Sequence, residues 1–260
     1  MNAPPELASR LRSLKLEMER REPSNGVEMN QSIPGLILYI NPRRTTDYPS
    51  SNPNKIEIAG NGDCVDETSI QRAISRYASL NISKFFFWHD PLPNHRNFGD
   101  LLRRCGLEPF AGTNYPVLAR EPARFGATPT ELAIRRLSSP VLGCCGGDGA
   151  KERFRATVGK EGFDHFAAFC GDSVVATARL FVHAGLAYLC DAGTLEEYRH
   201  RGAQTALIAA RINRAAELGC ALCVTQTLGL LTTSLNNLLR SGFQPSFERS
   251  VHQLQPSIGG

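Results

Sequence analysis

The chain has 260 residues, a formal net charge of +4, and 42% hydrophobic and 21% charged residues, a composition typical of a globular protein with a proper core. Basic and acidic residues are interspersed, so the composition indicates neither a nucleic-acid partner nor a membrane surface. No apolar run approaches the roughly 20 residues that span a bilayer, and the first six residues lack a signal-peptide pattern, so we expect a cytoplasmic protein.

The first predicted element is an amphipathic helix over 6–22, because Leu7, Leu11, Leu14 and Met18 recur at helical spacing with charges between them. This helix packs either on the body of the protein or on a second copy in a homodimer. Strands and helices then alternate. The expected elements of the first half are a strand at 35–40, a loop at 41–54, a strand at 55–59, a helix at 67–80, a strand at 83–88, a helix at 98–105 and a strand at 115–120.

A linker is predicted at 121–130, where Pro122, Gly126 and Pro129 interrupt the pattern. We therefore expect two domains, at 1–125 and 126–260. The expected elements of the second are a strand at 131–137, a glycine-rich loop at 138–149, a hairpin of strands at 163–169 and 173–181, a strand at 186–191, a helix at 203–218, a strand at 221–225, a helix at 234–241 with Ser234 as its N-cap, and a strand at 243–254.

Three local patterns resemble phosphate-binding, metal-binding or catalytic motifs, but each has a simpler structural explanation. The glycine-rich loop lacks the Gly-Lys-Ser/Thr ending of a phosphate-binding P-loop. Cys220 and Cys223 form a CxxC, and Cys144-Cys145 lies in the loop, but no second pair has metal-ligand spacing, so we expect no metal site and buried, unreactive thiols. The run 88–90, Trp-His-Asp, is interpreted as the end of a strand, where polar residues lead into a loop.

The stretch 198–206, Tyr-Arg-His-Arg-Gly-Ala-Gln-Thr-Ala, joins a predicted strand to a helix and brings glycine, two arginines and a helix start together. The first N–H groups of a helix have no internal partner, and the helix dipole favours an anion there. Gly202 lets the backbone approach a ligand closely. Two interpretations remain open: a pyrophosphate-binding turn, or an ordinary turn with a solvated basic face.

The two halves repeat the same order of elements at a nearly constant offset. The glycines that end the last helix of each half are 242 − 106 = 136 residues apart, and the helix starts are 203 − 67 = 136 apart. In place of the basic turn, the first half has 63–68, Asp-Cys-Val-Asp-Glu-Thr. Carboxylates at a helix N-terminus satisfy the dipole themselves and repel phosphate, so the first half is expected to be a degenerate copy.

On these motifs the second half resembles the GNAT superfamily of acetyl-CoA-dependent N-acetyltransferases. The family's pyrophosphate loop, Arg/Gln-x-x-Gly-x-Gly/Ala, stands here as Arg199-x-x-Gly202-x-Gln204, which departs at its last position. The strand before it has Glu196 where proline is usual. The resemblance covers 131–254, and the first half only as a degenerate copy. It implies an α+β fold class, with two tandem GNAT-like folds in which a central mixed sheet is flanked by helices.

The resemblance also implies a site for acetyl-CoA. Backbone N–H groups of the turn would bind the pyrophosphate, and the backbone at 194–196 would hold the pantetheine arm and polarise the thioester carbonyl. An asparagine on the following helix would contact the pantetheine. The implied cofactor-binding residues are Thr194, Leu195, Glu196, Arg199, His200, Arg201, Gly202, Ala203, Gln204, Thr205 and Asn237.

The set of catalytic residues that the resemblance implies is incomplete. The family often places a tyrosine acid four residues before the glycine that ends the last helix, and here that residue is Leu238. We expect Asp191, at the end of the central strand, to act as the base, with Tyr188 as a substitute acid. The alternative is that the two are only a polar pair at a strand end.

The leading interpretation is an enzyme that transfers the acetyl group of acetyl-CoA to a primary amine of a small-molecule acceptor. The alternative is a non-catalytic acyl-CoA-binding or interaction protein that retains the fold, which the missing tyrosine and Glu196 favour. A third interpretation is a structural duplicate whose N-terminal helix forms a dimer.

Overall fold

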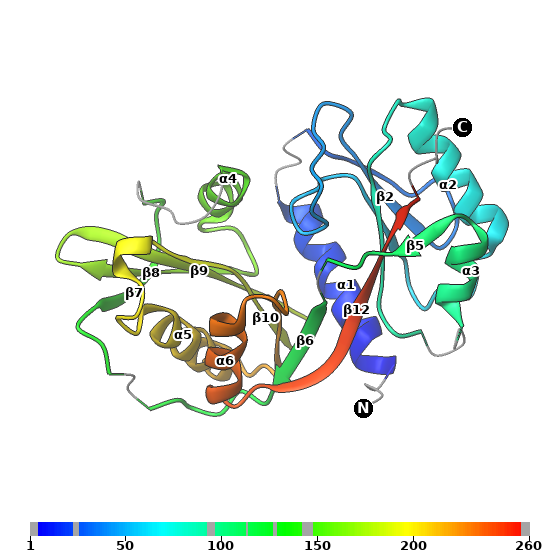
Figure 1. Cartoon of the computed structure of the whole chain (residues 1–260). Helices are drawn as coiled ribbons and strands as arrows, with labels where there is room; N and C mark the ends of the chain where they lie inside the picture. Colours follow the sequence, from blue (N-terminus) through cyan, green and yellow to red (C-terminus); the bar gives the residue numbers. More distant parts are fainter. Residues whose placement is uncertain are drawn as a thin grey trace. The chain divides into compact units, whose positions relative to one another are not determined.

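The computed structural model describes residues 5–22, 26–92, 97–112, 114–126, 129–141 and 148–255. These residues form two compact units (Figure 1). Unit 1 consists of Met1–Ser13, Ser24–Tyr115 and Phe247–Gly260, and unit 2 of Leu14–Pro23 and Pro116–Ser246. Neither unit is continuous in sequence, so both differ from the predicted domains at 1–125 and 126–260.

Unit 1 is built on a mixed sheet, here called sheet A. Its strands, in spatial order, are β1 (Glu28–Asn30), β2 (Leu36–Ile40), β3 (Lys55–Ile58), β4 (Phe86–His89) and β12 (Gln244–Leu254), with β5 (Leu107–Pro109) also paired to β12. Only β3 and β4 are parallel. The helices are α1 (Pro5–Arg21), whose first part belongs to this unit, α2 (Glu67–Ser79) and α3 (Phe98–Arg104).

The core of unit 1 lies where α2 and α3 cover sheet A. Tyr77 of α2 stacks on Phe85 with ring centroids 4.3 Å apart. Its hydroxyl donates to the backbone oxygens of Tyr39 and Lys55, at 2.9 and 2.8 Å. A buried hydroxyl needs such partners, and these fix the helix over two neighbouring strands.

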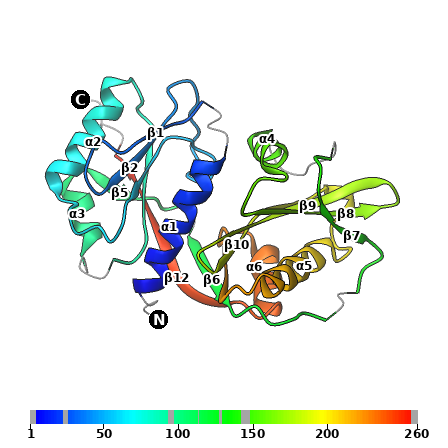
Figure 2. The same ribbon diagram turned by 180° about the vertical axis from the view of Figure 1, so that it is seen from behind.

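Unit 2 contains sheet B, with α5 (Ala203–Glu217) and α6 (Thr232–Arg240) on one face and α4 (Asp148–Thr157) on the other (Figures 1 and 2). The strands, in spatial order, are β6 (Tyr115–Arg120), β11 (Leu222–Gln226), β10 (Leu186–Thr194), β9 (Ser173–His183), β8 (Phe163–Cys170) and β7 (Ala133–Leu137). Only β10 and β11 are parallel.

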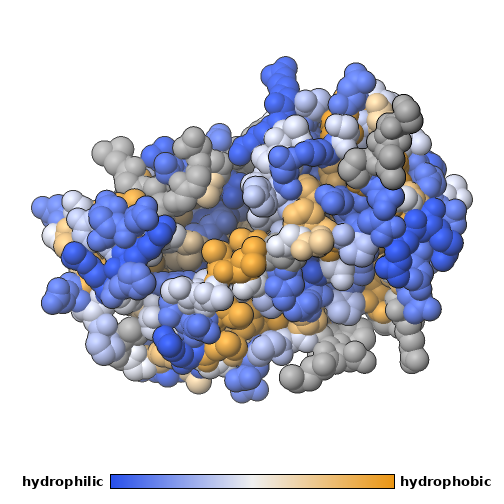
Figure 3. Space-filling view, in the orientation of Figure 1, coloured by the Kyte–Doolittle hydropathy of each residue, from blue (hydrophilic) through white to orange (hydrophobic). Residues whose placement is uncertain are grey.

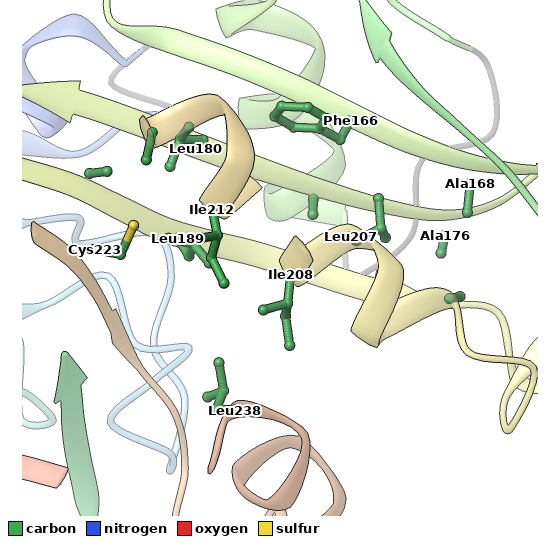
Figure 4. Close-up of a cluster of buried hydrophobic side chains, with 14 of the residues drawn as sticks. Phe166, Ala168, Ala176, Leu180, Leu189, Leu207, Ile208, Ile212, Cys223 and Leu238 are labelled. Carbon is green, nitrogen blue, oxygen red and sulfur yellow. The ribbon is translucent and has the colours of Figure 1, made fainter. Parts of the chain in front are cut away.

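The core of unit 2 follows from the two-residue period of the strands. Ala176 and Leu180 of β9 and Leu189 of β10 point toward α5, where they meet Leu207 and Ile212 (Figure 4). Small residues on β9 let the helix lie close to the sheet. Leu238 of α6 belongs to the same apolar cluster.

The last strand of each half pairs within the other unit. β6 follows α3 in the chain, yet its residues 117–120 pair with β11 of unit 2. β12 follows α6, yet its residues 250–253 pair with β4 of unit 1. Each sheet is therefore completed by a strand whose preceding helix belongs to the other unit.

The structure shows the predicted repeat of elements. β3, α2, β4 and α3 in unit 1 correspond to β10, α5, β11 and α6 in unit 2, and both strand pairs are parallel. The glycines after the last helices, Gly106 and Gly242, have φ of +82° and +81°. Such a left-handed residue is a common way to end a helix, and glycine adopts it without a steric penalty.

Some elements differ from the sequence prediction. β1, β5 and α4 are not predicted; α4 carries few apolar residues, and its start lies in the expected loop at 138–149. Residues 142–147, including Cys144 and Cys145, lie outside the described residues. Ser234 is wrong as an N-cap, because α6 begins two residues earlier, at Thr232, with Leu231 at the cap position. None of the helices in the described ranges is both long and apolar enough for a bilayer span.

Candidate functional site

The turn between β10 and α5 presents a row of unpaired backbone donors. A short 3-10 helix, Glu196–Tyr198, leads into the turn, where His200 and Gly202 have φ of +64° and +79°. The first helical bond runs from Ala206 N to Gly202 O at 3.0 Å. Within the part of the chain that the structure describes, the N–H groups of residues 200–205 have no acceptor. No side chain caps this helix start.

Glycine is required at the cap position by close contact as well as by φ. A Cβ on Gly202 would lie 3.0 Å from Pro129 O and 3.4 Å from Thr130 Cβ. Thr130 supports the turn from this side, because its hydroxyl donates to Arg201 O at 2.8 Å. The turn is thus held by the segment that leads into β7, and a larger residue at 202 would displace it.

The turn has a cationic surface. Arg199, His200 and Arg201 are exposed, and the first turn of α5 contains no acidic residue. Arg199 lies 3.6 Å from Glu196 across a solvent-exposed pair, which contributes little to stability. Arg201 lies over the Tyr198 ring, 5.1 Å from its centroid. Both guanidinium groups therefore belong to the exposed surface of the turn.

Gln204 joins α5 to α6 through a side-chain network. Its amide nitrogen donates to Ser234 Oγ at 3.0 Å, and its oxygen accepts from Asn237 Nδ2 at 2.8 Å. Thr227, just after β11, donates to the same Ser234 hydroxyl at 3.4 Å. This network gives a structural reason for glutamine where the related loop has glycine or alanine. It also places Asn237 beside the turn.

Strands β10 and β11 separate beyond Leu189. Their parallel register ends at the pair Leu189–Thr225, where Thr225 Oγ1 donates to Leu189 O at 2.9 Å. A bulge follows between Cys190 and Gly193, and β10 then continues to pair with β9 alone. The predicted pantetheine-binding segment lies here: Leu195 N donates to Val175 O on the β9 side at 2.9 Å.

A buried arginine that sequence reasoning missed holds this bulge. Arg211 of α5 donates to Leu207 O at 3.0 Å, Arg179 O at 3.3 Å and Cys190 O at 3.4 Å. Burial lowers the pKa of Arg211 to about 10. Its sequence signal is an arginine on the apolar face of α5, four residues after Leu207, where a hydrophobic residue is expected.

The predicted base and acid lie in different surroundings. Asp191 is at the bulge with φ of +43° and accepts a hydrogen bond from Arg179 Nη2, and Arg153 Nε lies 3.8 Å from its Oδ2. Tyr188 is buried within β10, paired with Phe181 and Val224. The Asp191 carboxylate is therefore an ion-paired group.

The corresponding turn of unit 1 is closed by its own side chains. Asp66 is the N-cap of α2, and its Oδ1 accepts from Ser69 N at 2.7 Å while Ser69 Oγ accepts from Asp66 N at 2.9 Å. The hydrogen bond from Ser69 lowers the pKa of Asp66. The expectation that the first copy satisfies its own helix start is confirmed.

The run 88–90 belongs to a buried ion network in unit 1. Arg249 Nε donates to Asp90 Oδ1 at 2.7 Å and its guanidinium lies over Trp88, 5.0 Å from the ring centroid. Arg12 lies 3.6 Å from Asp90 Oδ2. These contacts give the run a structural role.

Cys220 and Cys223 are buried, and burial raises the pKa of both thiols. Among the described residues, no group of three or more histidine, cysteine and acidic side chains is arranged to hold a metal.

Residues 132–243 match the family model described as Acetyltransferase (GNAT) family. No curated protein is significantly similar to the chain in sequence. Similar solved structures include a GCN5-related N-acetyltransferase from Kribbella flavida, with TM-score 0.65, 16% identity, and coverage of 97% of this chain and 96% of that one. A tandem GNAT protein from the clavulanic acid biosynthesis pathway has TM-score 0.63, 10% identity, and coverage of 97% and 94%. These likenesses confirm the predicted GNAT-type α+β fold.

Proposed function

We propose that this chain, which carries an acetyltransferase domain of the GNAT family at residues 132–243, transfers the acetyl group of acetyl-CoA to a primary amine of a small molecule. The observation that carries the proposal is the row of N–H groups at residues 200–205, which have no acceptor among the residues that the structure describes. Helix N-termini with unpaired donors bind phosphate groups, and the exposed arginines of this turn add positive charge. The cytoplasmic location expected from the sequence fits the free thiols among the described cysteines.

The residues present fit a pyrophosphate. Gly202 leaves no side chain between the backbone and a ligand, and the approach of Pro129 O to within 3.0 Å of a Cβ there excludes larger residues. Asp66 shows the opposite arrangement in unit 1, where the cap is a carboxylate. We therefore assign a single acetyl-CoA site, in unit 2.

The separation of β10 from β11 supplies the place for the pantetheine arm and the thioester. Beyond Leu189 the edge of β10 that faced β11 is available for strand-like pairing, while β9 holds the other edge. Arg211 of α5 holds the bulge by donating a hydrogen bond to Cys190 O. A backbone donor aimed at the thioester oxygen would stabilise the charge that develops during amine attack by a few kcal/mol.

Exposed leucines border the same edge of sheet B. The carboxyl ends of the parallel strands β10 and β11 lie at one edge, and the segments after them contain Leu195, Leu230 and Leu231. Leu230 and Leu231 are 72% and 51% exposed. Figure 3 shows apolar side chains gathered over the loop before α6. We infer that this surface contacts apolar parts of the ligands, which include the acceptor amine.

Release of the CoA thiol tests the activity. The protein would be mixed with acetyl-CoA and, one at a time, with spermidine, glucosamine, phenethylamine and lysine amide, and free thiol would be followed with a disulfide dye. Multiple turnovers with any amine support the proposal. The matched control is the Gly202→Val protein, which should release no thiol above background.

A second function is favoured by Leu238. This residue stands where the family often has a tyrosine acid, and it is buried in the core with 5% of its surface exposed. A non-catalytic acyl-CoA-binding protein would therefore retain this fold and site. It predicts saturable binding of acetyl-CoA with no turnover for any amine. Because a thiolate leaves without prior protonation, we favour the enzyme.

A further inference from the structure

A short hydrogen-bond network connects the start of α5 with α6 and with the end of β11. Gln204, the second residue of α5, donates from Nε2 to Ser234 Oγ of α6 at 3.0 Å. Its Oε1 accepts from Asn237 Nδ2 at 2.8 Å. Thr227, the first residue after β11, donates from Oγ1 to the same Ser234 hydroxyl at 3.4 Å. All four residues belong to unit 2.

The network lies along the route that we assign to the pantetheine arm. One end is Gln204, whose backbone N–H belongs to the row at residues 200–205 that would bind the pyrophosphate. The other end is Thr227, two residues after Thr225, where the parallel register between β10 and β11 stops. The network therefore extends from the pyrophosphate end of the site to the place where the two strands separate.

Ser234 and Asn237 share one face of α6. They are three residues apart, a spacing that makes two side chains neighbours on a helix surface, and both are half-buried. Leu238, the residue after Asn237, is buried in the core of unit 2. This packing holds α6 beside α5 (Figure 1). The two polar side chains are therefore kept next to the first turn of α5.

The hydrogen bonds of Gln204 decide which atoms of its two partners remain available. The Ser234 oxygen accepts from both Gln204 and Thr227, so its two lone pairs are used and its own O–H is left to donate. Asn237 gives an N–H to Gln204, and its Oδ1 is left to accept. Within the ranges that the structure describes, neither the Ser234 O–H nor Asn237 Oδ1 has a hydrogen-bond partner.

We propose that Gln204 is a positioning residue that holds Ser234 and Asn237 as a matched pair for one amide group of the pantetheine arm. This inference rests on the proposed function, because it assumes the acetyl-CoA site of unit 2. A secondary amide has one carbonyl oxygen and one N–H. The Ser234 hydroxyl donates to that oxygen, and Asn237 Oδ1 accepts from that N–H. Ser234 thereby joins the residues that contact the ligand, whereas the resemblance to the family implies Asn237 alone.

This role explains why a glutamine stands at the last position of the loop motif. Glycine and alanine, the usual residues there, have no side chain that reaches α6. The glutamine amide donates to one partner and accepts from the other, so it fixes both at once. Without Gln204, the Asn237 amide is free to turn over and to present its N–H groups in place of its oxygen.

Two ligands separate the role of Gln204 from that of the turn beside it. Calorimetric Kd values of the full-length protein would be measured for acetyl-CoA and for phosphoadenosine diphosphate, the nucleotide half of CoA, which has the pyrophosphate but no pantetheine arm. Gln204→Ala keeps the backbone N–H, and alanine suits a helix. The Kd for acetyl-CoA should rise about 30-fold, the change expected for two hydrogen bonds, whereas the Kd for the nucleotide half should change less than about 2-fold.

Combined substitutions test whether Gln204 acts through its partners. Ser234→Ala and Asn237→Ala should each raise the Kd for acetyl-CoA about 5-fold. In a protein that carries both, adding Gln204→Ala should change this Kd less than about 2-fold, because the side chains that it positions are already absent. Asn236→Ala, on the exposed side of α6, is the matched control and should bind like the wild type. Urea unfolding would show that each variant is folded.

The outcomes distinguish this inference from the proposed function. If the wild type binds neither ligand, the acetyl-CoA site and this inference both fail. If the wild type binds acetyl-CoA and Gln204→Ala binds it equally well, only the role of Gln204 is wrong. Equal weakening of both ligands by Gln204→Ala also overturns it, since Gln204 would then support the turn alone.

The single substitutions on α6 keep the inference testable even where Gln204→Ala does not fold. If Ser234→Ala or Asn237→Ala leaves the Kd for acetyl-CoA unchanged, the matched pair is wrong. If Gln204→Ala still weakens binding about 30-fold in the protein that lacks both partner side chains, Gln204 contacts the ligand itself and is not a positioning residue.

Discussion

Gly202 and Asp66 are the N-cap residues of corresponding helices, 202 − 66 = 136 residues apart, and they complete those helices in opposite ways. Asp66 closes α2 with a reciprocal pair of hydrogen bonds to Ser69. Gly202 leaves the start of α5 without a side-chain cap. The two corresponding positions therefore distinguish a helix start that is satisfied by its own side chains from one that is not.

Replacing Gly202 should weaken CoA binding strongly. Gly202→Val forces a β-branched residue to φ of +79° and against Pro129 O, so the turn must move. Losing two charge-assisted hydrogen bonds at about 1.5 kcal/mol each weakens binding about 100-fold. Gly219→Val is the control, since φ there is +67° and the surrounding space is open. Calorimetric Kd values should change only for Gly202→Val; equal effects would contradict the assignment.

Gln204 and Asn237 should be energetically coupled. Gln204→Ala removes hydrogen bonds to Ser234 and from Asn237, at a cost of about 1–2 kcal/mol in unfolding free energy. In a double-mutant cycle with Asn237→Ala, urea unfolding should show a coupling energy of about 1 kcal/mol. Asn236→Ala, on the exposed side of α6, supplies the uncoupled control. If the losses of unfolding free energy for the 204 and 237 substitutions are strictly additive, this prediction is wrong.

Arg211 should contribute to stability through the carbonyls that it satisfies. Arg211→Met keeps the side-chain volume but leaves the oxygens of Leu207, Arg179 and Cys190 without this donor. At about 1 kcal/mol for each buried acceptor, unfolding free energy should fall by about 3 kcal/mol. Arg214→Met, which breaks a more exposed pair with Asp164, should cost less than about 1 kcal/mol. Equal losses for the two variants would show that the bulge does not depend on Arg211.

His165 should make the fold sensitive to acid. Its folded pKa, about 4, lies below the ordinary value of about 6.5, because burial disfavours the charged ring. Between these two pKa values the unfolded chain binds a proton that the folded chain does not bind. The contribution of His165 to the free energy of unfolding is therefore fully present above pH 6.5 and is lost as the pH falls toward 4. The slope for one histidine is at most about 1.4 kcal/mol per pH unit.

The comparison with His165→Gln isolates this contribution. Glutamine can keep a hydrogen bond to Thr157, whose hydroxyl lies 2.9 Å from the His165 ring nitrogen. Between pH 6.5 and 5, urea unfolding should show a loss about 2 kcal/mol larger for the wild type than for the variant. Parallel pH profiles would mean that His165 charges in the folded state.

The two predicted domains should not fold separately. A fragment of 126–260 lacks β6, which pairs with β11, and lacks Glu22, which contacts the buried Arg179. Its own β12 would have no β4 to pair with. We expect this fragment to be insoluble or unfolded by circular dichroism, and co-expression with 1–125 to restore a soluble complex. A stable, cooperative fragment on its own would contradict the exchanged-strand arrangement.

The sequence predicts much of the fold because each repeated element has a local signal. Strand and helix periods place most of the elements, and Gly106 and Gly242 end helices as expected. The partner of each last strand has no such signal. β6 and β12 both follow a helix and a left-handed glycine. No local pattern therefore tells whether such a strand pairs in the sheet of its own half or in the other sheet.

The site is predictable where it depends on residue type and not where it depends on tertiary contact. Gly202 and the arginines beside it mark the turn directly. Arg211 is hidden, because its role depends on a bulge that only the folded sheet forms. The role of Asp191 shows the same limit, since its partner Arg179 lies on the neighbouring strand.

Isothermal titration of the full-length protein with acetyl-CoA tests the central claim most directly. We predict saturable binding with a stoichiometry of one, because of the two corresponding helix starts the one at Gly202 has no side-chain cap, while Asp66 closes the other. Binding should weaken with added salt, since phosphate groups meet exposed arginines. No heat at high protein concentration, or two equivalent sites per chain, would contradict it.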